Sequence, residues 1–209
     1  MNCRLCKSTA ISFYTGRFGE YFDCPRCRGV FLAPEDHLNA ADERARYEIH
    51  NNNVDDAGYQ NFVKPIVDTV LSSFTTGKKG LDFGCGTGPV ISYLLSKEGY
   101  SVDLYDPIFS NETLVFRNRY DFIVCCEVIE HFRHPGREFL KLQQLLEPGG
   151  KLVCMTQLLA DSIDFDNWTY KDDPTHIFFY RSETISYIQR HFGFESSTIE
   201  DRLIVFSNF

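Results

Sequence analysis

The sequence predicts an α/β fold in which a doubly wound, mostly parallel sheet follows a small N-terminal hairpin and a helical linker. Three observations support this prediction. Strand-like and helix-like segments alternate from residue 80 onward, as they do in proteins with a parallel sheet. A glycine-rich turn joins the first of these strands to the first helix, and two Cys-x2-Cys pairs lie near the N-terminus. A chain of 209 residues is long enough for one such domain with a small addition.

Four cysteines define the first unit of the chain. Cys3 and Cys6 form one Cys-x2-Cys pair, and Cys24 and Cys27 form a second pair after a spacer of 17 residues. Each pair offers two thiolates on one side of a turn, and two pairs complete the tetrahedron that Zn²⁺ prefers. The spacer has aromatic runs around two glycines, a pattern that is typical of a β-hairpin. We therefore expect a structural zinc ribbon over residues 1–34, since so short a unit cannot bury a core of its own.

Two other interpretations of these cysteines remain open at this point. In the first, the two pairs are disulfides or reduced thiols without a metal. In the second, one pair is redox-active. The redox interpretation is less favoured because neither pair follows a strand of a βαβ unit. The other four cysteines lie in apolar runs or in the glycine-rich turn, where we expect small core residues. They are Cys85, Cys125, Cys126 and Cys154.

Residues 35–76 predict a helical linker. A charged, exposed helix is expected at 35–49, followed by a polar loop at 50–58. A second helix is expected at 60–74, because apolar residues recur there at helical spacing. This spacing predicts a core-facing side for the second helix.

Residues 77–209 predict the α/β domain. The run at 121–126 is almost continuously apolar, as expected for a strand that is covered on both faces. The expected strands are 80–83, 101–106, 121–126, 151–156 and two within 195–207, and the expected helices are 89–98, 136–147 and 182–192.

The turn at 82–88 reads Asp-Phe-Gly-Cys-Gly-Thr-Gly. Glycines allow the backbone to turn tightly and to approach a ligand closely, and this turn lies between a predicted strand and a predicted helix. Asp106 ends the next strand, where a carboxylate is able to accept hydrogen bonds from both hydroxyls of a ribose. A dinucleotide site usually has the spacing G-x-G-x-x-G. Here the spacing is G-x-G-x-G after Asp82, and a carboxylate at that place suits a ligand with an amino group.

Four segments of the α/β domain are similar to motifs of a known family. LDFGCGTG at 81–88 resembles the first motif of class I S-adenosylmethionine-dependent methyltransferases, YDFIVCCEVIEHF at 120–132 resembles their fourth-strand motif, and LEPGGKLVCMT at 146–156 resembles their Pro-Gly-Gly turn into the fifth strand. DPTHIFFYRSETI at 173–185 resembles a segment of the quinol O-methyltransferase branch. The resemblance covers roughly residues 77–209 and implies a Rossmann-like methyltransferase fold. A four-cysteine ribbon precedes such a domain in some sugar C-methyltransferases, in some ribosomal-RNA methyltransferases and in bacterial zinc-ribbon methyltransferases of unassigned acceptor.

The resemblance implies a site for S-adenosylmethionine. The glycine-rich turn would line the methionine part of the cofactor, Asp82 would serve its amino group, Asp106 its ribose and Glu127 its methionine end. One departure from the family concerns the 14 residues at 107–120, where the usual third strand and its helix are missing or reduced to a short segment at 114–116. The Pro-Ile-Phe segment that starts at Pro107 would then cover the adenine. The expected cofactor-binding residues are Asp82, Gly84, Cys85, Gly86, Gly88, Asp106, Pro107 and Glu127.

Methyl transfer from a sulfonium is an in-line displacement, so the enzyme mainly aligns the acceptor and excludes water. An acceptor hydroxyl or acidic carbon also needs a base. The candidates are His131 in Glu-Val-Ile-Glu-His, then His176 in Asp-Pro-Thr-His, then Glu130. The alternative for each histidine is a structural role, with the imidazole bonded only to its surroundings.

Aromatic residues gather between the fifth strand of the family and the last helix, where an acceptor pocket is expected. Either they form that pocket or a lid, or they are ordinary core. They are Trp168, Tyr170, Phe178, Phe179 and Tyr180. Tyr59 and Phe62 of the linker present the same choice between covering the cofactor and facing the core.

Charge and hydropathy restrict the function classes. The net charge of −8 argues against broad binding to nucleic acid, although residues 1–34 hold five basic and two acidic side chains. A small-molecule methyltransferase is therefore favoured over an RNA methyltransferase whose ribbon grips nucleic acid, and over a non-catalytic interaction module. No apolar segment has the length of a membrane span and the N-terminus does not resemble a signal peptide, so we expect a cytoplasmic protein.

Overall fold

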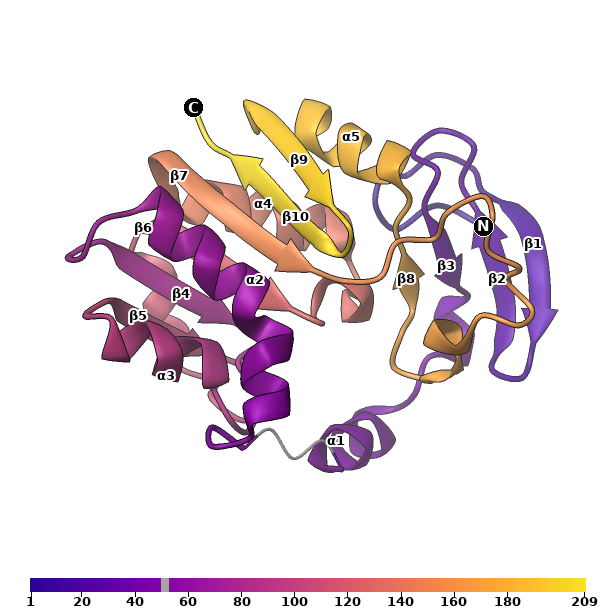
Figure 1. Cartoon of the computed structure of the whole chain (residues 1–209). Coiled ribbons are helices and arrows are strands. Elements are labelled where there is room, and N and C mark those ends of the chain that lie inside the picture. Colours follow the sequence, from indigo (N-terminus) through magenta and orange to yellow (C-terminus); the bar gives the residue numbers. More distant parts are fainter. Residues whose placement is uncertain (50–52) are drawn as a thin grey trace.

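The computed structural model describes residues 1–49 and 53–209, which form two sheets (Figure 1). The larger sheet has six strands in the order β5-β4-β6-β7-β10-β9, and the smaller has four in the order β1-β2-β3-β8. Helix α1 lies below the gap between them in Figure 1. The strands are β1 (Ile11–Gly16), β2 (Gly19–Asp23), β3 (Val30–Leu32), β4 (Lys79–Phe83), β5 (Ser101–Tyr105), β6 (Tyr120–Cys126), β7 (Leu146–Met155), β8 (Phe178–Phe179), β9 (Ser196–Glu200) and β10 (Leu203–Ser207).

The six-stranded sheet confirms the predicted α/β architecture. Strands β5, β4, β6 and β7 are parallel, whereas β10 is antiparallel to β7 and β9 is antiparallel to β10. The carboxyl ends of β4, β5 and β6 therefore meet at one edge of the sheet. The glycine-rich turn, Asp106 and Glu127 follow these three ends directly.

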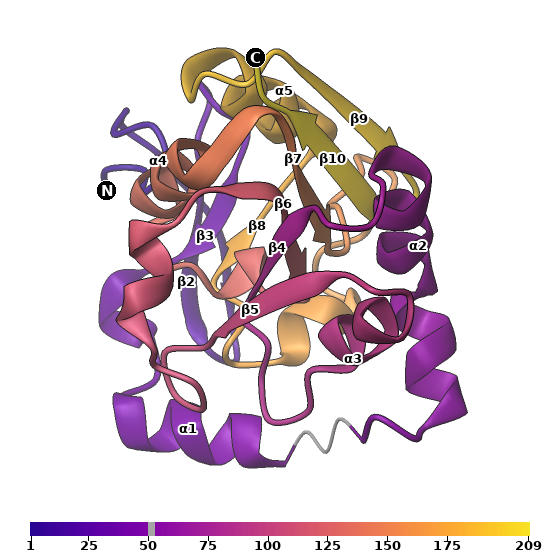
Figure 2. The ribbon, with the colours of Figure 1, turned by 90° about the vertical axis from the view of Figure 1, so that its left-hand side faces the viewer.

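Helices cover both faces of this sheet, as Figure 2 shows. Helices α2 and α3 pack on one face, where their apolar residues share a core with β6 and β7. Helices α4 and α5 pack on the other face, in a second core that also includes the ribbon cysteines. The helices are α1 (Ala40–Glu48), α2 (Ala57–Ser73), α3 (Val90–Lys97), α4 (Pro135–Leu145) and α5 (Ser182–His191).

The two predicted linker helices are present, but the predicted start of the first one is wrong. Helix α1 begins at Ala40 instead of residue 35, because the side chain of Asn39 accepts hydrogen bonds from two backbone N–H groups and caps the helix there. Asp56 caps α2 in the same way, so this helix begins inside the predicted loop. The first three residues of that loop, 50–52, lie outside the described residues.

Two short segments of the α/β domain have irregular structure. The residues between β5 and β6 hold a single 3-10 helix at Thr113–Arg117, which confirms that the usual third strand and its helix are reduced to a short segment. Strand β7 begins at Leu146, before the predicted start at residue 151. Its pairing with β6 shifts register between Tyr120 and Phe122, so the Pro-Gly-Gly turn forms an irregular start of the strand.

The smaller sheet contains the predicted hairpin and one strand that the sequence did not predict. Strands β1 and β2 pair antiparallel, and Gly16 pairs with Gly19 at the turn. Strand β8 pairs with β3 through Phe178 and Phe179, which come from the C-terminal half of the chain. These two residues are therefore buried members of the ribbon sheet, and the interpretation of them as an acceptor pocket is wrong.

The ribbon is bonded closely to the rest of the protein. Buried Arg181 donates to the carbonyl of Arg28 at 2.6 Å and pairs with Asp23 at 3.0 Å. A Cβ placed on Gly136, at the start of α4, would lie 2.5 Å from the carbonyl oxygen of Leu5. The ribbon therefore packs directly on the helix that follows the fourth-strand motif. None of the helices in the described parts of the chain is long and apolar enough to cross a membrane.

Candidate functional site

The glycine-rich turn has the backbone that its sequence predicts. Gly84 and Gly86 have φ of +84° and +62°, a region that favours glycine. A Cβ on Gly84 would lie 2.4 Å from the side chain of Val128, so this glycine also allows β4 and the segment after β6 to come close. The N–H groups of Gly84 and Cys85 donate to the carbonyl of Tyr105 at 2.7 and 3.1 Å. The turn is thus fixed against the end of β5.

Asp106 braces the turn from the neighbouring strand. One of its oxygens accepts from the N–H of Gly86 at 3.1 Å, and the other accepts from Ile108 and Phe109 at 2.8 and 3.0 Å. A carboxylate has about four acceptor sites, so most of the capacity of Asp106 is used within the protein. Asp82 is buried behind the turn and accepts from the hydroxyl of Ser92 at 2.8 Å. Burial raises the pKa of Asp82 to about 6.

A cavity of about 770 Å³ opens above the turn, within the range of roughly 300–1,000 Å³ that is usual for ligand sites. All eight residues that the sequence predicts for cofactor binding line it. His131 and His176 line the same cavity, and Tyr59 and Phe62 of α2 line it as well. Ile108 and Phe109 contribute to its wall, at the place where a cover for an adenine was expected.

The three predicted catalytic residues come together. Glu130, His131 and His176 each place one polar atom within 4.8 Å of those of the other two. The imidazole rings are 4.8 Å apart between centroids. Nδ1 of His131 donates to the carbonyl of Thr175 at 2.8 Å, and Nδ1 of His176 donates to the carbonyl of Tyr170 at 2.6 Å. These backbone bonds fix the tautomers, so that Nε2 of each ring has the lone pair.

Glu130 is completely buried, and burial raises its pKa. The hydroxyl of Tyr170 donates a hydrogen bond to its Oε1. Its Oε2 is buried and has no hydrogen-bond partner among the described residues. Burial and the neighbouring His131 lower the pKa of His176, so its imidazole is neutral near pH 7.

Glu127, one of the residues predicted to bind the cofactor, has an unusual backbone conformation and a charged partner. Its φ of +51° is rare for a residue with a side chain and marks a strained position at the end of β6. Arg202 donates to both of its carboxylate oxygens, at 2.8 and 2.9 Å. Burial and the charge of Glu130 raise the pKa of Glu127 to about 8, although Arg202 acts in the opposite direction. Arg202 lies in the turn between β9 and β10, and no sequence motif indicates its role.

The aromatic residues after β7 are mostly core. Trp168 and Phe179 pack in one buried cluster, and the buried hydroxyl of Tyr180 donates to the carbonyl of Ile129 at 2.7 Å. Tyr170 is the exception, because its hydroxyl lies between Glu127 and Glu130. The core interpretation thus holds for four of the five, and only Tyr170 is part of the site.

Helix α1 forms a wall of the cavity that the sequence did not predict. Glu43 and Tyr47 line the cavity from this helix. The ring of Tyr47 packs edge-on against His131, with 5.3 Å between centroids. This contact is hard to predict from the sequence, because the helix is charged and buries no residue completely. Helix α1 belongs to the site because its residue Tyr47 lies against His131.

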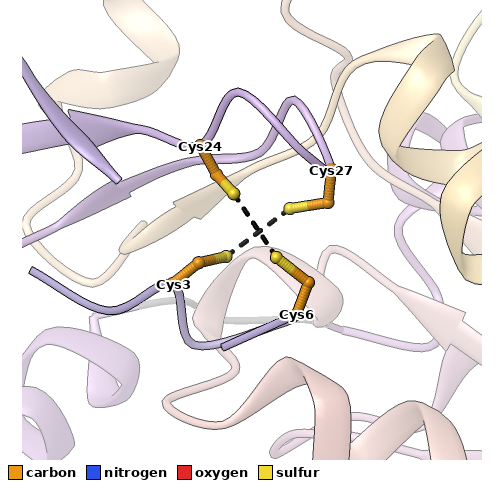
Figure 3. Close-up of side chains that lie close together, drawn as sticks. All are labelled: Cys3, Cys6, Cys24 and Cys27. Atoms are coloured by element: carbon orange, nitrogen blue, oxygen red, sulfur yellow. Dashed lines mark hydrogen bonds between the residues drawn. The ribbon is translucent and has the colours of Figure 1, made fainter. Parts of the chain in front are cut away.

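The four ribbon cysteines point toward a common centre, as Figure 3 shows. The sulfur atoms of Cys3 and Cys27 are 3.5 Å apart, and those of Cys6 and Cys24 are 3.4 Å apart. Four thiolates around one Zn²⁺ have sulfurs roughly 3.8 Å apart, since each Zn–S bond is about 2.3 Å. None of the four cysteines forms a disulfide in the described structure.

The two Cys-x2-Cys turns have the same backbone conformation. Lys7 and Arg28, which follow the second cysteine of each pair, both adopt the left-handed region, with φ of 65° and 61°. In each turn the N–H of this residue donates to the carbonyl of the first cysteine, at 3.0 and 2.8 Å. The four cysteines are therefore presented by two equivalent turns.

A methyltransferase domain family matches residues 56–198, which is more than half of the chain. The chain belongs to this family. It holds a methyltransferase domain, as its motifs predict. The match includes the glycine-rich turn, the cluster of Glu130, His131 and His176, and helix α2. A comparison with curated proteins found no match.

Solved structures with the same fold include three methyltransferases at low sequence identity. A magnesium protoporphyrin IX methyltransferase from Synechocystis, solved with bound S-adenosylmethionine, has a TM-score of 0.52 at 16% identity, over 82% of this chain and 92% of that one. A phosphoethanolamine N-methyltransferase from Haemonchus contortus has a TM-score of 0.56 at 17% identity, over 77% and 43%. An O-methyltransferase family protein from Burkholderia thailandensis has a TM-score of 0.51 at 15% identity, over 71% and 56%. The methyltransferase therefore spans only about half the length of two of these proteins.

Proposed function

We propose that this methyltransferase transfers a methyl group from S-adenosylmethionine to an oxygen or carbon of a small molecule. One observation supports this proposal above the others. The glycine-rich turn and the cluster of Glu130, His131 and His176 line or adjoin one cavity, so a cofactor on the turn would present its reactive end toward the cluster. The likeness of residues 173–185 to the quinol O-methyltransferase branch favours an oxygen acceptor.

The turn and its neighbours fit the cofactor. Gly84 and Gly86 leave the floor of the cavity without a Cβ, so the backbone is open to the methionine part. Asp106 retains acceptor capacity for a ribose hydroxyl, and the segment from Pro107 to Phe109 would cover the adenine. Asp82 and Glu127 would serve the amino group, directly or through water. When bound, S-adenosylmethionine supplies an electrophilic methyl group on a positively charged sulfur.

The protein supplies alignment and removal of a proton. Tyr47 and His131 pack together as one part of the cavity wall, and would align the acceptor with the methyl group. The proton of the acceptor would leave at the Glu130, His131 and His176 cluster. The aromatic residues Tyr59 and Phe62 would exclude water from the cofactor side.

Calorimetric titration tests the cofactor proposal. We expect micromolar binding of S-adenosylmethionine and S-adenosylhomocysteine, weakened at least tenfold in Asp106→Ala. The matched control is Asp103→Ala, which removes a carboxylate of β5 that bonds Tyr120 and Lys79 away from the cavity. A folded wild-type protein that binds neither compound contradicts the proposal and favours a non-catalytic module.

We further propose that residues 1–34 are a structural zinc ribbon and residues 35–76 a helical linker to the catalytic domain at 77–209. The convergence of the four sulfurs and the two equivalent turns support the zinc site. Reduced thiols of this kind are usual in the cytoplasm, which is the location that we propose.

A further inference from the structure

The structure points to a second metal site, which is separate from the four cysteines. We propose that Glu130, His131 and His176 bind one divalent transition-metal ion, of the class of Mn²⁺ or Zn²⁺, at the acceptor end of the cavity. This inference rests on the proposed methyl transfer, because the ion would act on the acceptor of that reaction.

The donor set fits such an ion. Two imidazoles and one carboxylate, with further positions open, are ligands that bind divalent transition metals in proteins. The three donor atoms lie within 4.8 Å of one another. Donor atoms that share one ion at about 2.1 Å lie roughly 3–4 Å apart, so only a small closure is needed.

The surrounding hydrogen bonds have already oriented the ligands. Nδ1 of both histidines donates to a backbone carbonyl, which leaves the lone pair of each ring on Nε2. Metal-binding histidines are commonly held in this way, since a bond at one nitrogen fixes the orientation of the other. Tyr170 holds Oε1 of Glu130 in the same manner.

The second, independent observation concerns the other oxygen of Glu130. Oε2 is buried in a fully buried residue and has no partner among the described residues. A buried carboxylate oxygen without a partner is costly, and such atoms call for a bound group. A cation beside His131 and His176 would satisfy it. Both histidines line the cavity, so the open positions of the ion would face the acceptor.

This site gives the ion a defined chemical role and names the acceptor class. An acceptor hydroxyl bound to the ion would have a lowered pKa and would lose its proton to a water molecule at this same cluster. Its oxygen then forms a bond to the methyl carbon, the carbon–sulfur bond breaks, and the electron pair of that bond stays on sulfur as a neutral thioether. The two imidazoles remain neutral ligands throughout. The acceptor would therefore bind through oxygen.

Mn²⁺ titration followed by electron paramagnetic resonance tests the site. The full-length protein is first loaded with zinc and freed of excess metal, so that the four cysteines are occupied. We expect one Mn²⁺ per chain, with affinity reduced at least tenfold in Glu130→Gln and in His176→Ala. The matched controls are Glu138→Gln and His134→Ala, which change a carboxylate and an imidazole of the same cavity outside the cluster and should bind as the wild type does.

The affinity for S-adenosylmethionine separates this inference from the proposed function. Wild type, His176→Ala and Glu130→Gln should bind the cofactor equally well, whereas Asp106→Ala should lose the cofactor and keep Mn²⁺. Two cluster variants are compared so that a folding defect in one of them does not decide the result. Circular dichroism detects such a defect. The metal site is contradicted if the folded, zinc-loaded protein binds no Mn²⁺, or if the cluster variants bind Mn²⁺ as tightly as the controls do. Cofactor binding would then still support the proposed function alone.

Discussion

Arg46 of helix α1 donates two hydrogen bonds to a single carboxylate oxygen of Asp173, at 3.1 Å from Nε and 2.7 Å from Nη2. The other oxygen of Asp173 accepts from the N–H and the hydroxyl of Thr175, at 2.9 and 2.6 Å. The carbonyl of Thr175 holds Nδ1 of His131. Helix α1 is thus bonded to the loop that orients a proposed catalytic histidine, although α1 itself is mostly exposed.

Replacement of Arg46 by alanine should weaken acceptor binding. The pair is partly exposed, so its loss should cost only about 1 kcal/mol of folding stability or less. The larger effect is on the wall of the cavity, and we expect the KM for the acceptor to rise about tenfold while the affinity for S-adenosylmethionine changes less. The control is Arg44→Ala, whose partner Glu48 lies on the exposed side of the same helix. Equal KM values for the two variants would contradict the role of the Arg46 pair.

Gly84→Ala should disturb both folding and cofactor binding. An added Cβ would lie 2.4 Å from Val128, and the φ of +84° is unfavourable for alanine. Gly77 has a φ of +92° with no atom within 4 Å of an added Cβ, so Gly77→Ala introduces the backbone strain alone, at about 1–2 kcal/mol. We expect Gly84→Ala to be less stable than Gly77→Ala and to bind S-adenosylmethionine at least tenfold more weakly. Thermal unfolding and calorimetry measure both effects.

Local patterns made much of this site predictable. Gly84, Gly86 and Asp106 follow strands directly, and the turn chemistry at a strand end depends on residues that are close in sequence. The same holds for the two Cys-x2-Cys turns. Glu130 and His131 were predicted because they follow β6 in a motif, although the partners of their side chains were not.

Contacts between distant segments were the ones that the sequence did not predict. Strand β8 consists of Phe178 and Phe179, and their partners Val30 and Phe31 lie in the N-terminal unit. An apolar pair of this kind has no feature that distinguishes a strand from a pocket wall. The bond between Arg202 and Glu127 joins residues 75 positions apart and depends on how β9 and β10 add to the sheet. Only the assembled sheet brings these residues together.

Loss of the zinc site should destabilise more than the ribbon. Cys3, Cys24 and Cys27 belong to the same buried core as α4 and α5, so the ribbon does not unfold independently. We expect Cys24→Ser to lose the ribbon zinc and to lower Tm by about 10 °C or more, because structural zinc contributes several kcal/mol. Cys126→Ser is the control, since this half-buried thiol lies outside the cluster. Metal analysis of Cys24→Ser that finds the same zinc content as in Cys126→Ser would contradict this prediction.

The contribution of Glu127 to folding stability should fall as the pH rises from 5 to 8. The pKa of Glu127 is raised in the folded state to about 8, from an ordinary value of 4.5, mainly by burial. The folded state therefore binds more protons than the unfolded state between these values, and its stabilisation, complete below pH 4.5, is lost as the pH passes 8. The decline should amount to a few kcal/mol, since a tenfold change in an ionisation constant corresponds to about 1.4 kcal/mol.

Urea unfolding of Glu127→Gln at several pH values measures this contribution. The variant cannot ionise at this position, so its stability should change less between pH 5 and 8 than that of the wild type. The matched control is Glu138→Gln, which removes a partly exposed carboxylate that pairs with Lys141 on helix α4. A wild-type profile that matches that of Glu127→Gln would place the ionisation of Glu127 outside this pH range.

Tyr170→Phe should change the pH dependence of catalysis without unfolding the protein. The hydroxyl of Tyr170 bonds the ionised form of Glu130, and this bond lowers the pKa of Glu130 against the effect of burial. Its loss should raise that pKa, and the acid limb of the pH–rate profile should move to higher pH. Tyr14→Phe is the matched control, since it removes a hydroxyl that bonds Asp166 in the ribbon region. A lower rate with an unchanged pH profile would mean that Tyr170 supports the site through packing alone, because only the hydrogen bond acts on the ionisation of Glu130.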